Sequence, residues 1–224
     1  MSNIQIQWLG LSDYTAIYTK QRNFTDSRTE TTPDQLWCLE HPPVYTLGLA
    51  GKTEHILNQG AIPVLKTDRG GQVTYHGPGQ LVIYPLIDLR RKAISIKKYV
   101  NLLEQSVIDL LNELGIEAAR KQNAPGVYVN NSKIAALGIR VRNGCCYHGL
   151  ALNVNMNLEP FSGINPCGYA GLDVTRLSDF GVMLSVEQVS QRLVPVIASH
   201  LGFNGKQIIA SSDDDQSISS YRVA

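Results

Sequence analysis

The fold is decided by residues 126–154, which read GVYVNNSKIAALGIRVRNGCCYHGLALNV. Three runs rich in apolar and β-branched residues, at 127–129, 133–141 and 149–154, are separated by turns. Short runs in such close succession are typical of strands that pair with their neighbours along the chain. The stretch therefore predicts an antiparallel meander in the middle of the protein.

Helices are predicted on both sides of this meander. Between Ser95 and Leu114 apolar residues recur at steps of three and four, which gives one apolar stripe, and Gly115 follows as a stop. A second helix is expected from Ser185, which forms a capping-box pattern with Gln188, to about Leu201.

The first third of the chain adds a helix at 12–30. Strands are expected at 36–39, 44–48, 62–66 and 81–87, with a diproline turn between the first two. Helices at both ends with runs of strands between them predict an α+β fold, with a mixed, largely antiparallel sheet flanked by helices. We expect a single domain at 1–205 and a polar, flexible tail at 206–224.

Composition narrows the function classes. The chain has 224 residues, of which 43% are hydrophobic and 17% charged, as suits one globular domain. Lys and Arg number 20 against 19 Asp and Glu, which gives no reason to expect nucleic acid as a partner. No run approaches the roughly 18 apolar residues that cross a bilayer, and the first residues lack a secretory-signal pattern. We expect a cytoplasmic protein with no membrane partner, and a monomer because no apolar surface stripe is evident.

Cofactor motifs are missing from the sequence. The four cysteines and five histidines form neither a CxxC nor an HxxxH pair, which are common spacings of zinc ligands. No glycine pattern of the dinucleotide-binding or P-loop kind is present. We therefore expect neither a metal nor ATP as a cofactor.

Residues 69–80, RGGQVTYHGPGQ, contain four glycines in twelve positions. Glycines let a backbone approach a ligand closely, and Arg69, Thr74 and His76 supply charge and hydrogen-bonding groups. Glycine richness alone is more typical of a hairpin with a wide turn. An arginine and a histidine in the same loop favour a binding site.

Lys133 heads an otherwise apolar run. A lysine at a strand entrance is usually a solvated edge residue that discourages aggregation. If the side chain faces an apolar cleft instead, desolvation lowers its pKa and lets it act as a base. The sequence leaves both interpretations open.

Cys167 stands between a proline and a glycine, and therefore in a turn whose amide groups can form an oxyanion hole. A free cysteine is most often a small buried hydrophobe, which fits Cys38, and the pair Cys145–Cys146 is interpreted as structural. Cys167 is the candidate nucleophile. Since an ordinary thiol is only a few per cent ionised at neutral pH, it needs a cation or base beside it. The candidate partners are Lys133, His76 and His148.

Taken together and in their order along the chain, these sequence motifs resemble those of the octanoyltransferase family of lipoate biosynthesis. The resemblance spans about residues 36–174. It is carried by RGGQVTYHGPGQ at 69–80, KIAALG at 133–138, HGLALN at 148–153 and PCG at 166–168, with EHPPVYTLG at 40–48 in support. It implies the α+β fold of biotin and lipoate protein ligase catalytic domains.

The resemblance also implies a reaction. An octanoyl or lipoyl group moves from the thioester of acyl carrier protein to a lysine amine on a lipoyl domain, either of a 2-oxoacid dehydrogenase or of glycine cleavage H protein. Cys167 would carry the acyl group, and Lys133 would lower the thiol pKa and relay protons. The residues that would line the acyl and carbonyl pocket are Arg69, Gly70, Gly71, Gln72, Val73, Thr74, Tyr75, His76, Ala136, Leu137, Gly138, Gly149, Leu150 and Ala151.

Two other classes of protein remain as alternatives. An ATP-dependent lipoate or biotin ligase of the same fold would form an acyl-adenylate and would not need Cys167. A lipoyl-binding module without catalysis would need neither Cys167 nor Lys133.

Overall fold

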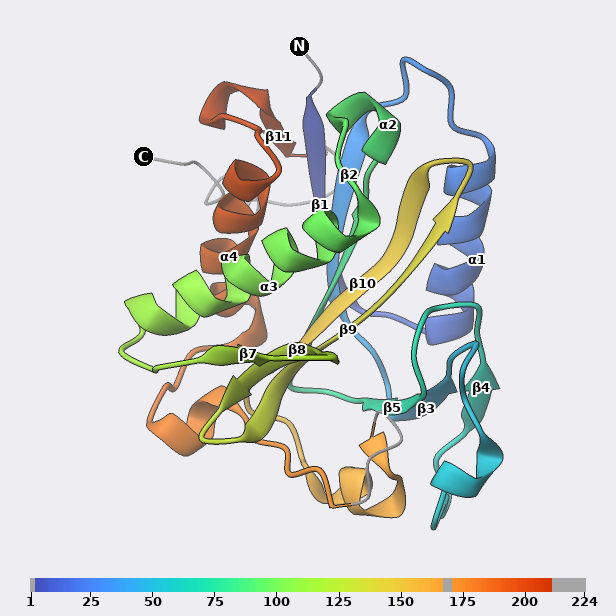
Figure 1. Ribbon diagram of the computed structural model, residues 1–224, viewed down its shortest axis with the longest axis vertical. Coiled ribbons are helices and arrows are strands. Elements are labelled where there is room, and N and C mark those ends of the chain that lie inside the picture. Colours follow the sequence, from blue (N-terminus) through green and yellow to red (C-terminus); the bar gives the residue numbers. More distant parts are fainter. Residues whose placement is uncertain (1–2, 167–170, 211–224) are drawn as a thin grey trace.

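The computed structural model describes residues 3–166 and 171–210. Its main element is an eight-stranded sheet (Figure 1). The strands of this sheet are β1 (Ile4–Leu11), β2 (Asp34–Glu40), β6 (Gln80–Leu86), β7 (Ala119–Lys121), β8 (Ala124–Val129), β9 (Ser132–Arg142), β10 (Cys145–Asn153) and β11 (Ile208–Ala210). Their order is β11-β1-β2-β6-β10-β9-β8-β7. Strand β1 is parallel to β2 and β11, and the other pairs are antiparallel.

The predicted meander is confirmed as β8, β9 and β10. In the register of β9 and β10, Ala136 lies opposite Ala151 and Gly138 opposite Gly149. Small residues therefore meet along the middle of this strand pair, and this is where the candidate site forms.

Helices cover both faces of the sheet (Figure 1). They are α1 (Tyr14–Asp26), α2 (Leu89–Lys92), α3 (Ile96–Glu113) and α4 (Val186–His200), with short 3-10 turns at η1 (Thr53–His55), η2 (Glu159–Gly163), η4 (Leu177–Phe180) and η5 (Gly205–Gln207). Alternate residues of β6 show the two layers, because Ile83 packs in the core beneath α3 and α4, whereas Val82 and Tyr84 pack with Ile17 of α1. No helix in the described ranges is long and apolar enough to cross a membrane.

The N-terminal caps of helices α3 and α4 are those that the sequence predicts. The Ser95 side chain caps α3 by accepting from the amide of Lys98. Ser185 and Gln188 form the predicted capping box at the start of α4. Local side-chain hydrogen bonds of this kind satisfy amides that lack partners within the helix, so the sequence could locate both starts.

A second sheet of three strands lies beside the first. It contains β3 (Val44–Leu47), β4 (Val64–Lys66) and β5 (Val73–His76), in the order β4-β3-β5. The two strands that flank Pro42–Pro43 thus belong to different sheets, since β2 pairs in the large one. The prolines end one strand and redirect the chain, because neither can donate to a ladder.

The domain boundary predicted at residue 205 is too early. Strand β11 (Ile208–Ala210) pairs in parallel with Ile4, Gln5 and Ile6 of β1 and forms the edge of the large sheet. The first residues of the segment predicted as a flexible tail therefore belong to the domain. The pattern of 206–210 is too short to read as a strand alone, and its pairing partner lies at the other end of the chain.

Candidate active site

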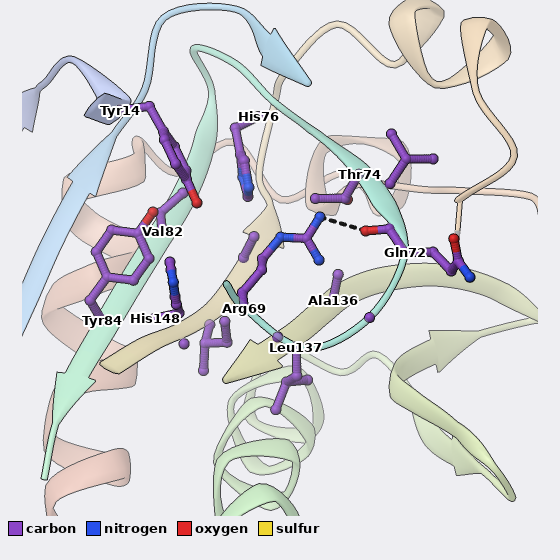
Figure 2. A pocket seen from close by; sticks show the side chains of 16 residues that line it. Tyr14, Arg69, Gln72, Thr74, His76, Val82, Tyr84, Ala136, Leu137 and His148 are labelled. Atoms are coloured by element: carbon purple, nitrogen blue, oxygen red, sulfur yellow. Dashed lines mark hydrogen bonds between the residues drawn. The ribbon is translucent and has the colours of Figure 1, made fainter. Parts of the chain in front are cut away.

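A hollow of about 500 Å³, including its open mouth, lies on the α1 side of β9 and β10 (Figure 2). Twelve of the fourteen residues predicted to line a pocket do line it, namely Arg69, Gly71, Gln72, Val73, Thr74, His76, Ala136, Leu137, Gly138, Gly149, Leu150 and Ala151. Four further residues complete the wall: Tyr14, Val82, Tyr84 and His148. Segments far apart in the sequence therefore form one cavity.

The two remaining predicted residues lie elsewhere. Tyr75 points into the core of the small sheet, where its ring centroid lies 5.6 Å from that of Tyr45 and 5.5 Å from that of Phe161. Gly70 lines a neighbouring cavity, which shares several wall residues with the hollow and is also lined by Lys133. Successive side chains of a strand point to opposite faces, which explains the position of Tyr75. In β5, Thr74 and His76 face the hollow and Tyr75 faces away from it.

Arg69 holds the glycine loop in place. Its Nη2 donates to the carbonyl oxygens of Thr46, at 2.6 Å, and of Gln72, at 2.7 Å (Figure 2). Its Nε donates to the Thr46 hydroxyl and its Nη1 to the Gly70 carbonyl. The buried guanidinium therefore fixes the shape of the loop, and its charge is spread over backbone oxygens of the wall.

Two glycines at this site, Gly138 and Gly149, stand where backbone segments pack closely together. The loop crosses β9 where the Gly70 amide donates to the Ile139 carbonyl at 3.0 Å. A Cβ at Gly138 would lie 3.0 Å from the Gly70 oxygen, and a Cβ at Gly149 only 2.1 Å from the Ile83 oxygen. Gly149 is thus required for the close approach of backbones that frames the cavity, and a side chain at Gly138 would press the glycine loop away from β9.

Lys133 is buried, with only 4% of its surface exposed, so the solvated-edge interpretation is wrong. Its Nζ donates to the Pro125 carbonyl at 3.1 Å and lies 5.2 Å from the ring centroid of Tyr128. An amine held in this way beside an apolar ring is protected from water and fixed in direction.

Residues before and after the predicted nucleophile, Cys167, lie close to Lys133. The Lys133 amide donates to the Asp173 carbonyl at 2.8 Å, and its carbonyl accepts from the Thr175 amide at 3.0 Å. Pro166 and Lys133 line the same small cavity, together with Val174. Cys167 itself lies outside the described residues.

The other three cysteines are buried and act as packing residues. Burial raises the pKa of the Cys38 and Cys146 thiols to about 12 and also raises that of Cys145. Thiols of this kind stay protonated at neutral pH and are poor nucleophiles. In the described ranges, no group of three or more His, Cys, Asp or Glu side chains is placed to hold a metal.

Neutral histidines line the wall opposite Lys133. Burial lowers the pKa of His76 to about 3, and its Nδ1 donates to Gln80 Oε1 at 2.7 Å. Burial also lowers the pKa of His148, although hydrogen bonding to Asp68 opposes this. His76 therefore contributes a fixed neutral ring to the pocket.

Sequence reasoning missed Tyr14, Val82 and Tyr84. Val82 and Tyr84 share one face of β6 by simple alternation, a signal that the run 81–87 contained. Tyr14 is the first residue of α1, and nothing local indicates that this helix start meets β6 and β10.

Known proteins show strong similarity to this chain. The family model described as the lipoyl protein ligase A/B catalytic domain matches residues 13–198. An octanoyltransferase of Laribacter hongkongensis is 57% identical over 198 residues, covering 88% of this chain and 96% of that protein. An octanoyltransferase of Dechloromonas aromatica is 58% identical over 193 residues, covering 84% and 94%.

Solved structures share the fold at low identity. A bipartite lipoate protein ligase from Thermoplasma acidophilum superimposes with a TM-score of 0.74 at 17% identity, covering 99% of this chain and 90% of that one. A biotin protein ligase from Aquifex aeolicus gives a TM-score of 0.54 at 14% identity, covering 90% and 69%. These likenesses confirm the predicted fold class.

Proposed function

The chain belongs to the lipoyl protein ligase A/B catalytic domain family, and we propose that it is an octanoyltransferase of protein lipoylation. Relatives that are more than half identical over nearly their full length are named for this activity. The observation that supports the chemistry is the burial of Lys133, whose backbone bonds to Asp173 and Thr175 and which lines a small cavity with Pro166, the residue before Cys167.

The first half of the proposed reaction loads the enzyme. The Cys167 sulfur attacks the carbonyl carbon of an octanoyl thioester, and a new C–S bond forms. The bond to the donor sulfur then breaks, and the donor leaves as a thiol that takes up a proton. Lys133 supports this step by stabilising the thiolate and exchanging the proton. The octanoyl chain lies in the hollow between β9, β10 and the glycine loop.

The second half of the proposed reaction transfers the acyl group from the enzyme to the acceptor. The ε-amine of the acceptor lysine attacks the acyl-enzyme carbonyl, an amide C–N bond forms, and the C–S bond to Cys167 breaks. The proton lost by the amine returns to the sulfur through Lys133. A covalent intermediate lets two protein partners use one site in turn.

Partners and cofactors follow from this scheme. The acceptors are lipoyl domains, as expected for octanoyltransferases and lipoate ligases, and we propose acyl carrier protein as the donor. Exchange between two thioesters is close to neutral in free energy, so the reaction needs neither ATP nor a metal.

The experiment is a transfer assay with purified octanoyl-acyl carrier protein and a lipoyl domain, with and without ATP. The mass of the lipoyl domain reports the product. We expect the octanoyl mass increase without ATP and at an unchanged rate when ATP is added. A strict need for ATP would instead make the chain a ligase, as several proteins with this fold are.

A further inference from the structure

His148 has a backbone conformation that is unusual in a strand. Its φ is +56° in the middle of β10, whereas the other described non-glycine residues with positive φ lie in turns. A left-handed residue interrupts the alternation of side chains along a strand. As a result the rings of Tyr147 and His148 both lie on the α1 side, stacked with centroids 5.0 Å apart.

The His148 ring is locked from several directions. Its Nε2 lies 2.9 Å from Asp68 Oδ1, and the ring of Tyr18 on α1 stacks on it at 5.2 Å. The Tyr147 hydroxyl donates to the other oxygen of Asp68. Burial tends to raise the pKa of Asp68, but the hydrogen bonds from His148 and the two tyrosines outweigh it and hold the pKa well below its usual range. The carboxylate therefore stays ionised and accepts from Nε2–H.

The second ring nitrogen of His148 is a buried acceptor. With the proton on Nε2, Nδ1 carries a lone pair, and this atom is buried without a hydrogen-bond partner. The residue as a whole is 1% exposed and lines the hollow. A buried polar atom of this kind resists being covered by more hydrocarbon.

His148 lies at the end of the hollow that is remote from Lys133. Lys133 lines two cavities that share wall residues with the hollow, one through Thr74 and Ala136 and the other through Gln72 and Leu137 among others. Tyr84 and His148 line neither of these two cavities. From Ala136 the wall continues past the Ala151 pair to the Gly138–Gly149 pair, and His148 is the next residue of β10. Tyr84 and His148 stand together at this end, away from Thr74 and Ala136 (Figure 2).

We propose that the His148 ring, positioned by Asp68, is the end stop of the acyl pocket and sets the length of saturated acyl chain that the enzyme accepts. The inference rests on the proposed octanoyl transfer. Aliphatic wall residues such as Val82 can shift to admit another methylene, but a ring held by stacking and a charged hydrogen bond cannot. A longer chain would also have to press against the unpartnered Nδ1.

The test compares chain lengths within one enzyme. The ratio of kcat/KM for decanoyl to that for octanoyl thioester is measured for wild type, His148→Ala and His148→Phe. One methylene in such a pocket typically changes the rate by about 10-fold to 200-fold. We expect His148→Ala to raise the decanoyl to octanoyl ratio by about tenfold or more. His148→Phe keeps a ring of similar bulk but loses the hydrogen bond to Asp68, so it should raise the ratio by a smaller factor than His148→Ala.

Two further variants separate this role from a structural one. Asp68→Asn should raise the ratio by a smaller factor, because it loosens the ring without removing it. Leu193→Ala, in the core on the opposite face of the sheet, should lower stability and leave the ratio unchanged. A ratio that His148→Ala does not alter, or that His148→Phe raises equally, overturns the inference. Wild type that fails to transfer octanoate at all overturns the proposed function instead.

Discussion

The two ends of the hollow proposed to hold the acyl chain are built differently. At the His148 end, neutral or ion-paired rings are fixed by hydrogen bonds within the described fold. At the Lys133 end, a lysine with 4% exposure bonds through its backbone to Asp173 and Thr175 and lines a small cavity with Pro166. Under the proposed reaction the two ends have different tasks, since one end would limit the length of the substrate and the other would hold the proton that is exchanged.

The largest expected effect comes from the reactive end. Lys133→Ala and Lys133→Arg should each slow enzyme acylation by about 10²-fold to 10⁴-fold, the usual contribution of a positioned acid–base group. Arginine keeps the charge but does not give up its proton at accessible pH. Rapid-quench measurement of acyl-enzyme formation checks this.

Lys121→Ala provides the matched control, since this lysine is exposed on the neighbouring strand β7. Its acylation rate should equal that of wild type. Thermal unfolding of all three variants shows whether they are folded. Wild-type acylation rates in both Lys133 variants would show that the two ends do not differ in the way described.

A smaller effect is expected at the loop between the two ends. Arg69→Lys removes the forked donor that joins Thr46, Gly70 and Gln72, and takes a donor away from the carbonyl oxygen of each. We expect a loss of about 2–4 kcal/mol in the free energy of unfolding and a higher KM for the octanoyl donor. Urea unfolding and steady-state kinetics measure the two changes.

The matched change Arg140→Lys, at an exposed position of β9, should alter neither quantity. If Arg69→Lys behaves like Arg140→Lys, the arginine does not hold the loop.

The smallest effect concerns the neutral rings at the rigid end. Burial lowers the pKa of His41 to about 4 and that of His76 to about 3. Below pH 6.5 the unfolded chain therefore binds more protons than the folded one, so stability falls as the pH falls. Each histidine should cost about 2 kcal/mol by pH 5.

Urea unfolding at pH 7.5 and pH 5 measures this loss. In His41→Gln, the difference between the two pH values should shrink by about 2 kcal/mol. An unchanged difference would mean that the His41 ring is protonated in the folded protein.

Local signals and the family resemblance explain what the sequence could predict. The meander and the start of α4 at Ser185 follow from patterns within a few residues, whereas most of the pocket wall was implied by the resemblance of its motifs. The position of β11 and the burial of Lys133 depend on segments far away in the chain, namely β1 and residues 173–175. A short window contains neither partner, so no pattern within it can decide them.

The position of the His148 ring also depends on residues far away in the chain. Its motif was visible, but its role depends on a left-handed φ and on Asp68, eighty residues earlier. Alternation along β10 would have placed the ring in the opposite layer. Long-range hydrogen bonds override the strand pattern at this position.

The most direct test of the central claim is the intact mass of the enzyme after incubation with octanoyl-acyl carrier protein, followed by peptide mapping. We expect one octanoyl adduct, located on Cys167. Cys38, Cys145 and Cys146 should stay unmodified because their thiols are buried and protonated. A full rate of transfer with no adduct, or an adduct on one of the three buried cysteines, would contradict it.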